Sequence, residues 1–385
     1  MDDVYDVIVI GLGAMGSASL YQLSKSEIKV LGIDQFSPPH NKGSSFGDTR
    51  ITRLAVGEGA EYVPFVLRSH EIWKELEEKS GKRILHEVGN AIFANEYGNQ
   101  HGSENFIAQT EKFAKQFKIE HELMDNVQLS KHFPLFNFEN GETGYFEKHG
   151  GYVLPEVAIK TQLDLAKENN AEIITNTKVL SLNSEDNAVV VRTSNAEYRA
   201  KKVITTAGAW VNDFLPSSHQ VFKVERQVLY WFDMKTDHDQ FRDIPTFVWL
   251  HGDKDTDQIY GFPAIDGERG GLKLATEQHS VTTTPDNFET SVSKEEEAEM
   301  FKTHVQKQIP ALSNKVIKSV ACKYTVTPDY GFVIDKHPED PNIIIASPCS
   351  GHGFKHSAAI GETLAQLATR DKTKINITSF RLDRF

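Results

Sequence analysis

The chain begins with a pattern that few folds can accommodate: a buried strand, a glycine-rich turn and a helix. Residues 7–10 are a run of β-branched side chains, typical of a strand buried on both faces of a parallel sheet. Gly11, Gly13 and Gly16 follow in G-x-G-x-x-G spacing, and residues 14–23 have a helical pattern. The first glycine permits a tight turn, the second lets a pyrophosphate approach the backbone, and the third lets helix and strand pack closely. The helix N-terminus would then present free N–H groups to that anion.

A second strand completes this unit and narrows the choice of ligand. Residues 30–33 form an apolar strand that ends at Asp34. A carboxylate at that tip can accept hydrogen bonds from a ribose hydroxyl and would repel the 2′-phosphate of NADP. The order of strand, turn, helix, strand and acid predicts a dinucleotide-binding Rossmann unit. The pattern leaves FAD and NAD open, and a glycine-rich turn without a ligand is the structural alternative.

The C-terminal part of the chain predicts a second unit of the same kind. Residues 202–206 form a strand, and residues 342–347 form another that enters the glycine-rich segment 350–355 and then a helix over 357–367. Between them, residues 221–277 are rich in aromatic and β-branched side chains with Pro, Gly and Asp breaks, which predicts antiparallel hairpins. The predicted fold class is therefore α/β plus α+β: a Rossmann-type domain split along the chain, with an inserted antiparallel-sheet domain. Further helices are predicted over residues 62–79, 157–168 and 294–308.

Charge and cysteine content exclude several classes of protein. The 42 Lys and Arg residues against 54 Asp and Glu give a net charge of −12, which repels nucleic acid and anionic lipid. The N-terminal apolar run is too short for a signal core or a membrane span. The two cysteines, Cys322 and Cys349, lack C-x-x-C spacing, which argues against a disulfide framework or a metal site. We expect a cytoplasmic enzyme without a metal, a nucleic-acid partner or a membrane partner.

Several long segments then point to one family. They are DVIVIGLGAMG, PPHNKGSSFGDTRITRLAVGEGAEYVP, IYGFPA, GLKLA, ACKYTVTPDYGFVID, SGHGFKHS and the terminal FRLDRF. With these segments the chain resembles, over nearly its whole length, the monomeric sarcosine oxidase and N-methyl-L-tryptophan oxidase family of FAD-dependent amine oxidases, in the D-amino-acid-oxidase-like fold group. The resemblance implies a monomer that oxidises the C–N bond of a secondary amine, such as an N-methyl amino acid. Oxygen would be the acceptor, and the products would be the demethylated amino acid, formaldehyde and hydrogen peroxide.

Three alternatives remain open. An NAD-dependent dehydrogenase would share the N-terminal unit, an FAD dehydrogenase would use another acceptor, and a flavin-binding protein would have no turnover. On the family reading, the FAD-binding domain comprises residues 1–88, 150–217 and 321–385, and the substrate domain comprises residues 89–149 and 218–320.

The resemblance also implies a set of FAD contacts. Asp34 would bind the ribose, and Cys322 would form a covalent bond to the flavin ring. From the residues alone, Cys322 is a thiol in an apolar strand, where free cysteines are usually inert. Cys349 has no such motif around it and is expected to be a buried thiol. The implied cofactor-binding residues are Gly11, Gly13, Ala14, Met15, Gly16, Asp34, Thr49, Arg50, Val179, Cys322, Gly351, Gly353, Phe354 and Lys355.

Arg53 and Lys355 resemble the pair of cations that holds the substrate carboxylate in this family. Two fixed positive groups would orient an amino acid so that its N-methyl carbon faces the flavin. The alternative for Arg53 is a structural ion pair with Glu58 or Asp48. The alternative for Lys355 is a solvent-facing lysine, although a cation at a helix start is unfavourable.

Four further residues are implied as catalytic. Lys273 would lie near flavin N5 and help oxygen accept electrons, whereas strand alternation by itself places it on a solvated face opposite two leucines. Arg50 would lie against the flavin, with Thr49 in the same loop. Tyr260 and Tyr324 would be active-site aromatics. The plain alternatives are a surface cation and two packed tyrosines.

The chain departs from the family pattern at three places. Ser45 and Phe46 stand where relatives commonly have two histidines, and Val56 stands where a tyrosine is common. Glu277 stands where a histidine often follows the lysine by four residues, and His279 lies two residues further on. These departures leave FAD binding and amine oxidation intact but argue against sarcosine itself. Glu277 is therefore a predicted substrate-binding residue that could receive a cationic part of a substrate.

Overall fold

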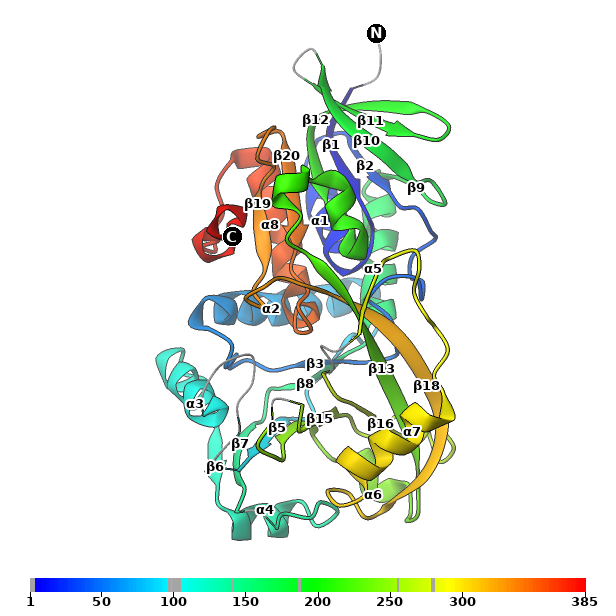
Figure 1. The fold of residues 1–385 in the computed structure, drawn as a ribbon. Coiled ribbons are helices and arrows are strands. Elements are labelled where there is room, and N and C mark those ends of the chain that lie inside the picture. The colour runs from blue at the N-terminus through cyan, green and yellow to red at the C-terminus, as the bar shows by residue number, and fades with distance from the viewer. Residues whose placement is uncertain are drawn as a thin grey trace.

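The computed structural model describes residues 4–95, 98, 105–139, 141–185, 188–254, 256–277 and 281–385, and their strands form three sheets (Figure 1). In the first sheet, parallel strands run in the order β20-β12-β1-β2-β9, and β11, β10 and β19 extend it through antiparallel pairs. The bounds are β1 (Val4–Ile10), β2 (Val30–Ile33), β9 (Glu172–Ile174), β10 (Val179–Glu185), β11 (Ala188–Thr193), β12 (Glu197–Thr205), β19 (Val333–Lys336) and β20 (Ile343–Ser347).

The parallel strands bring distant loops to one edge of this sheet. The β-branched side chains Ile8 and Val9 are fully buried, as expected for a strand covered on both faces. Because parallel strands end at the same edge, the turns that follow β1, β12 and β20 meet there. The two Rossmann-type units predicted at the ends of the chain are therefore confirmed as parts of one sheet.

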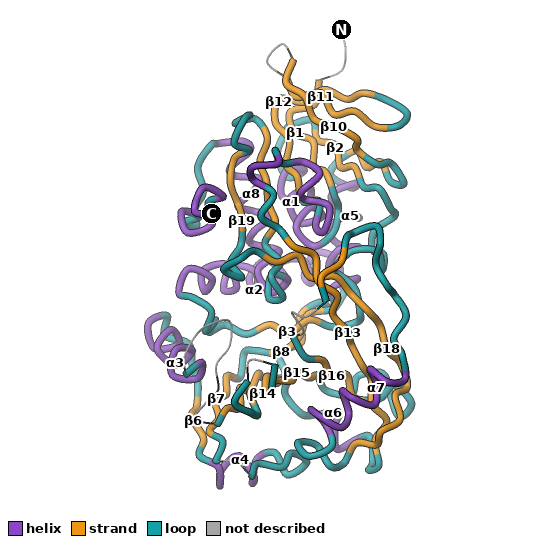
Figure 2. The backbone as a smooth tube through the Cα atoms, viewed as in Figure 1, coloured by secondary structure: helices purple, strands orange, loops and turns teal. Residues whose placement is uncertain are grey.

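Helices cover this sheet in a packed layer (Figure 2). Helix α1 (Ala14–Ser24) packs between α5 (Pro155–Glu168) and α8 (Ser357–Arg370), and α2 (Val63–Ser80) packs against α8. The α1–α8 approach depends on Gly361, because a methyl group at this position would overlap the side chain of Ala18. The predicted helices over 14–23, 62–79, 157–168 and 357–367 are thus confirmed.

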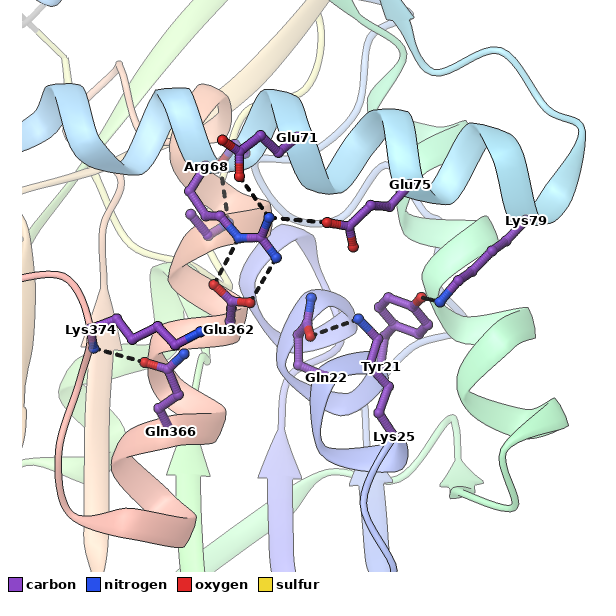
Figure 3. A network of polar contacts seen from close by, with 12 residues as sticks. Tyr21, Gln22, Lys25, Arg68, Glu71, Glu75, Lys79, Glu362, Gln366 and Lys374 are labelled. Atoms are coloured by element: carbon purple, nitrogen blue, oxygen red, sulfur yellow. Dashed lines mark hydrogen bonds and ion pairs between the residues drawn. The ribbon is translucent and has the colours of Figure 1, made fainter. Parts of the chain in front are cut away.

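An ion-pair network ties these helices together (Figure 3). Arg68 on α2 donates to both carboxylate oxygens of Glu362 on α8, at 3.0 and 2.9 Å. Its guanidinium also contacts Glu71 and Glu75 on its own helix. The bidentate pair fixes α2 across α8, and Glu362 and Glu71 raise the pKa of Arg68 further above its usual value.

The second sheet is the inserted antiparallel sheet, with the order β17-β13-β16-β15-β14-β5-β7-β6 and β18 beside β13. The one exception to its antiparallel pairing among the described strands is β5 beside β14, which run parallel. The predicted fold class, α/β with an inserted antiparallel-sheet part, is confirmed. The bounds are β5 (Asn90–Ala94), β6 (Glu122–Met124), β7 (Thr143–Glu147), β13 (Lys223–Met234), β14 (Thr246–Leu250), β15 (Gln258–Gly261), β16 (Leu272–Ala275), β17 (Thr282–Thr283) and β18 (Leu312–Val326).

The long strands β13 and β18 join the two parts of the molecule (Figure 1). They pair over nearly their whole length and extend from the antiparallel sheet up to the parallel one. The predicted domain boundary between residues 320 and 321 falls inside β18, so this strand contributes to both parts. The domain limits themselves remain a prediction.

Smaller elements complete the fold. The third sheet lies between the two parts and contains β3 (Arg50–Thr52), β8 (Gly151–Val153) and β4 (Leu85–His86). The helix predicted over 294–308 is α7 (Lys294–Met300) continued by a π-helical turn, and it buries Met300 and Val305 rather than being wholly solvated. No helix in the described ranges is both long and apolar enough to cross a membrane. The remaining helices are α3 (Phe106–Gln116), α4 (Asn126–His132) and α6 (Asp239–Arg242).

Candidate active site

A groove follows the edge where the parallel strands end. It encloses about 1360 Å³ of empty space, open mouth included. Both glycine turns contribute to its wall, although more than 330 residues separate them (from 13 to 351). The predicted site residues that line it are Gly11, Gly13, Ala14, Met15, Asp34, Arg50, Val179, Tyr324, Gly351, Gly353 and Phe354.

The first glycine turn leaves room for a ligand at its centre. Gly11 has a φ of +83°, and a methyl group there would come within 2.5 Å of the Thr206 carbonyl oxygen. At Gly13 the nearest atom to such a methyl group is Ser45 Oγ at 3.7 Å, so this position is open. Gly16 faces the backbone of Gly11 and does not line the groove, so its role is helix–strand packing.

The N-terminus of α1 and the tip of β2 supply groups that suit a dinucleotide. Helix α1 begins after Gly13, which has no side chain to cap it, and Ala14 N makes a long hydrogen bond of 3.4 Å to Ser45 Oγ. The N–H groups of this first turn and the positive end of the helix dipole suit a pyrophosphate. Asp34 accepts hydrogen bonds from the backbone N–H groups of Leu12 and Phe36, each at 2.7 Å. The same carboxylate therefore stabilises the glycine turn and keeps lone pairs for a ribose hydroxyl.

The second glycine turn is held against β18. Ser350 N donates to Thr325 O at 2.9 Å, and Gly351 has a φ of +83°. A methyl group at Gly353 would overlap the Pro348 carbonyl oxygen, so the turn tolerates only glycine there. Ser347 Oγ is buried on the groove wall without a partner among the described residues, as expected of a group that binds a ligand.

FAD fits this groove on these observations. The groove is lined by the N-terminus of α1, by the acid at the tip of β2 and by the Ser347 hydroxyl, which has no partner among the described residues. The aromatic rings of Phe36 and Trp210 line it as well. Sequence reasoning missed both rings. The sequence does indicate Trp210, because this residue ends the small-residue turn after β12, where the backbone can approach a cofactor. No local motif indicates Phe36.

The two predicted carboxylate-binding cations lie near the same carboxylate, that of Glu58, and neither lines the groove. Arg53 Nη2 donates to both oxygens of Glu58, each at 2.6 Å, and Lys355 Nζ lies 3.8 Å from Glu58 Oε1. Arg53 is 3% exposed and Lys355 is 4% exposed, so a solvent-facing Lys355 is excluded. Lys355 Nζ also donates to His352 O at 2.9 Å. Glu58, which the sequence indicated only as an alternative partner of Arg53, lies between the two cations.

The pKa of Lys355 lies close to neutral pH. Burial lowers its pKa to about 7, and the Arg53 charge acts in the same direction. The carboxylates of Glu58 and Glu277 oppose this shift by stabilising the ammonium. His356, packed next to it, is fully buried, and burial lowers its pKa, so that its ring is neutral.

Lys273 is buried rather than solvated, so the surface placement suggested by strand alternation is wrong. Its Nζ donates to Gly47 O at 2.6 Å, to Thr49 O at 2.8 Å and to Thr49 Oγ1 at 3.0 Å. These acceptors match the three hydrogens of an ammonium group, although burial lowers the pKa of Lys273. Thr49 is itself buried and does not line the groove. The structure places it in contact with Lys273, and its predicted contact with the cofactor stays a prediction.

Arg50 lies on the groove wall and is held by backbone carbonyls. Its guanidinium donates to Thr49 O at 2.8 Å and to Ser44 O at 2.9 Å. Tyr260 Oη and Tyr324 Oη lie 3.4 Å apart, and burial raises the pKa of each hydroxyl. Arg50 and Tyr324 therefore both line the groove, whereas Tyr260 does not line it and contacts Tyr324.

The two cysteines differ in their access to the groove. Cys322 is 1% exposed and packs in an apolar cluster with Phe46, Trp231 and Tyr324, and burial raises the pKa of its thiol. Cys349 is half-buried and lines the groove. The expectation that it is a buried thiol is therefore wrong.

Glu277 does not line the groove but lies next to the Gly351 turn, which does. A methyl group at Gly351 would come within 3.2 Å of Glu277 Oε1 and 2.9 Å of Tyr324 Cε2, so carboxylate and ring meet at this turn. Its charge raises the pKa of Lys355, Tyr260 and Tyr324. His279 lies outside the described residues.

Two glutamates, one buried and one half-buried, position the loops that contain the site, and no sequence motif marks them. Glu147, at the end of β7, accepts hydrogen bonds from Leu54 N, from Ala55 N at 3.0 Å and from the Tyr145 hydroxyl at 2.9 Å. Glu156 on α5 likewise accepts from Gly47 N at 2.7 Å. Glu147 thus fixes the backbone next to Arg53, and Glu156 fixes the loop whose carbonyl oxygens bind Lys273.

We predict that Glu147→Gln lowers the free energy of unfolding by about 2–3 kcal/mol, because hydrogen bonds to charged groups are strong and the new amide would face backbone N–H donors. Denaturation by urea at neutral pH measures the change. Tyr145→Phe is the matched control, since it removes one donor to the same carboxylate and leaves the loop contacts in place. We expect a loss of about 1 kcal/mol for it. Equal stability of Glu147→Gln and the parent protein would contradict the role of Glu147.

Comparison with known proteins agrees with this geometry. The family model described as FAD dependent oxidoreductase matches residues 6–367. A monomeric sarcosine oxidase of Bacillus sp. (strain NS-129) is 36% identical, with 100% of this chain and 98% of the relative covered. An N-methyl-L-tryptophan oxidase of Yersinia pestis (strain Pestoides F) is 32% identical, with 99% of each chain covered.

Solved structures share the fold at low sequence identity. NikD, described as an unusual amino acid oxidase essential for nikkomycin biosynthesis, superimposes with a TM-score of 0.85 at 18% identity, over 98% of this chain and 97% of that one. The L-proline dehydrogenase from P. horikoshii gives a TM-score of 0.81 at 20% identity, over 100% and 98% of the two chains. From its full-length matches, the chain belongs to the FAD-dependent oxidoreductase family, together with the monomeric sarcosine oxidases and N-methyl-L-tryptophan oxidases.

Proposed function

We propose that this protein is an FAD-dependent oxidase of the C–N bond of a secondary amine, specifically of an N-methyl amino acid. The observation that supports this most directly is the buried pair Arg53 and Lys355, each within three residues of a groove residue, Arg50 or Phe354. Two buried cations at one point suit a carboxylate. Arg53 Nε is also buried without a partner among the described residues, so a further acceptor fits there.

The relatives support the choice of amine. The names of those that match over the full chain describe oxidases of sarcosine and of N-methyl-L-tryptophan, both N-methyl amino acids. The products would be the demethylated amino acid, formaldehyde and hydrogen peroxide, with oxygen as the acceptor. We also propose that the enzyme acts as a monomer in the cytoplasm, where its two unpaired cysteines would stay reduced.

The glycine turns, Asp34 and the N-terminus of α1 would hold the FAD. Bound FAD supplies the hydride acceptor for amine oxidation and the reductant for oxygen. Arg53 and Lys355 would orient the substrate by its carboxylate, and Glu58 would then share Arg53 with it. The Tyr260 and Tyr324 rings would exclude water from that end of the groove. Lys273 would supply a positive charge to help oxygen accept electrons from the flavin. Its hydrogen bonds to Gly47 and Thr49 hold the 47–49 loop in place.

A covalent flavin link is part of the proposal, and two thiols compete for it. Cys322 is the residue implied by the ACKYT segment, and Arg50 and Lys273 lower the pKa of its thiol against the larger effect of burial. Cys349 lines the groove directly. We favour Cys322 because it packs against Tyr324 at the end of the groove that also holds Arg50.

The function is tested by a screen of N-methyl and cyclic amino acids with purified, yellow protein. We expect one equivalent of peroxide for each amine oxidised. A colourless protein would favour an NAD-dependent dehydrogenase. If an amine bleaches the flavin in the absence of air, slow reoxidation in air would then favour a dehydrogenase with another acceptor. If no amine bleaches the flavin, a flavin-binding protein without turnover is favoured.

The flavin link is tested by acid precipitation. Wild-type precipitate should stay yellow, Cys322→Ser should release the flavin into the supernatant, and the matched variant Cys349→Ser should stay yellow. Release from Cys349→Ser alone would reassign the link, and a white wild-type precipitate would refute it.

Carboxylate binding should depend on pH through Lys355. Since the pKa of Lys355 is about 7 and an anion binds its protonated form, affinity should be greatest below pH 7 and should fall as pH rises through 7. The fall should approach about tenfold per pH unit. Titration with propionate, followed by the flavin spectrum, measures this. Lys355→Arg keeps its charge and should flatten the profile, so an equally steep profile in that variant would exclude Lys355 as the titrating group.

A further inference from the structure

A loop of the antiparallel part of the molecule reaches the groove of the parallel part. Residues 284–293 connect β17 to α7, and this yellow loop extends toward the parallel sheet (Figure 1). Arg226 on β13 holds its C-terminal end, because the guanidinium donates to Glu289 O at 2.9 Å and to Ser291 O at 2.6 Å. The loop therefore has a fixed base on the antiparallel sheet.

A side chain of this loop is bonded to a residue of the groove wall. Trp210, in the 3-10 helix Gly208–Phe214 that follows β12, lines the groove and is 7% exposed. Its indole Nε1 donates to Asp286 Oδ1 at 2.9 Å. An indole has a single N–H group, so this one bond restricts the rotation of the whole ring.

Other contacts hold the same ring from different sides. Lys323 Nζ lies 5.2 Å from the centroid of the Trp210 ring and 4.4 Å from that of Phe288, which belongs to the same loop. The ammonium also donates to Lys42 O at 2.8 Å, directly before residues that line the groove. The ring of Phe36, which lines the groove as well, lies 5.8 Å from that of Trp210. The loop, the cation and the two rings thus form one cluster.

This cluster lies next to the residue that is predicted to bind the ribose of FAD. Phe36 N donates to Asp34 Oδ1 at 2.7 Å, so the two aromatic rings stand near that carboxylate. Aromatic rings suit a flat base, which they contact through their faces or edges. A ring that is already held in place binds such a ligand at a lower entropic cost than a ring that rotates freely.

We propose that Asp286 is a positioning residue for FAD, because it holds the Trp210 ring in the orientation that binds the cofactor. Asp286 does not itself line the groove, so it would act through Trp210 and not by touching FAD. The antiparallel part of the molecule thereby contributes to cofactor affinity. The inference rests on FAD binding in the groove and not on which amine is oxidised.

Titration of the apoprotein with FAD, followed by the change in flavin fluorescence, tests this inference. The background is a protein whose flavin is released by acid, which is Cys322→Ser for the link proposed above. Asp286→Ala should weaken FAD binding about 5-fold, because the ligand must then order a freely rotating side chain. Asp286→Asn keeps an acceptor oxygen for the indole and should bind FAD as the background does. Glu295→Ala, which removes an exposed carboxylate on α7, is the matched control and should leave the affinity unchanged.

Trp210→Phe separates this role from a general effect on folding. Phenylalanine keeps an aromatic ring but has no N–H group to donate, so adding Asp286→Ala to this variant should not lower the affinity further. The same loss with and without Trp210→Phe would overturn the inference, because Asp286 would then act independently of the indole.

The other outcomes are equally decisive. Unchanged affinity in Asp286→Ala overturns the inference. A loss in Asp286→Asn as large as that in Asp286→Ala also overturns it, since charge and not the hydrogen bond would then matter. A background protein that takes up no FAD would overturn both this inference and the proposed function. A protein that binds FAD but oxidises no amine would contradict the proposed function alone.

Discussion

The parallel pairing of β20, β12, β1 and β2 is the constraint on which the rest of the site depends. Parallel strands must end at one edge, so the turn after β1 and the turn after β20 meet although they belong to opposite ends of the chain. Gly13 leaves space in the first turn, and Gly351 adopts a left-handed backbone in the second. The groove between them exists because the sheet forms, and the proposed FAD site follows from the groove.

Two buried charged groups and one half-buried one then fix the loops around that groove. Glu147, Glu156 and Lys273 are each bonded to backbone groups of the 47–55 region, at positions 90 or more residues away in the chain. Desolvation of such groups is costly, and their hydrogen bonds to otherwise unpaired backbone groups offset that cost. These contacts hold the segment 47–58, which supplies Arg50 to the groove wall and Arg53 to the proposed carboxylate site.

Two residues near the proposed substrate site are departures from the pattern that the resemblance implies. Phe46 packs with Trp231 and Cys322 in an apolar cluster. Glu277 places a carboxylate beside Tyr324 and Lys355. One change makes the surroundings of the thiol more apolar, and the other adds negative charge where the substrate is proposed to bind. The cofactor end, by contrast, keeps the full glycine turn and Asp34.

The chain's local patterns were enough to predict the Rossmann-type units, the main helices and the antiparallel insertion, since strand, turn and helix preferences act between residues close in sequence. Helix α1, predicted over 14–23, spans Ala14–Ser24. Three-dimensional packing alone revealed that Glu58 lies between Arg53 and Lys355, that Lys273 is buried and that Cys349 faces the groove. Alternation along β16 misplaced Lys273 because a loop 224 residues away in the chain covers that face. Such contacts depend on how distant segments pack, and no local pattern encodes that packing.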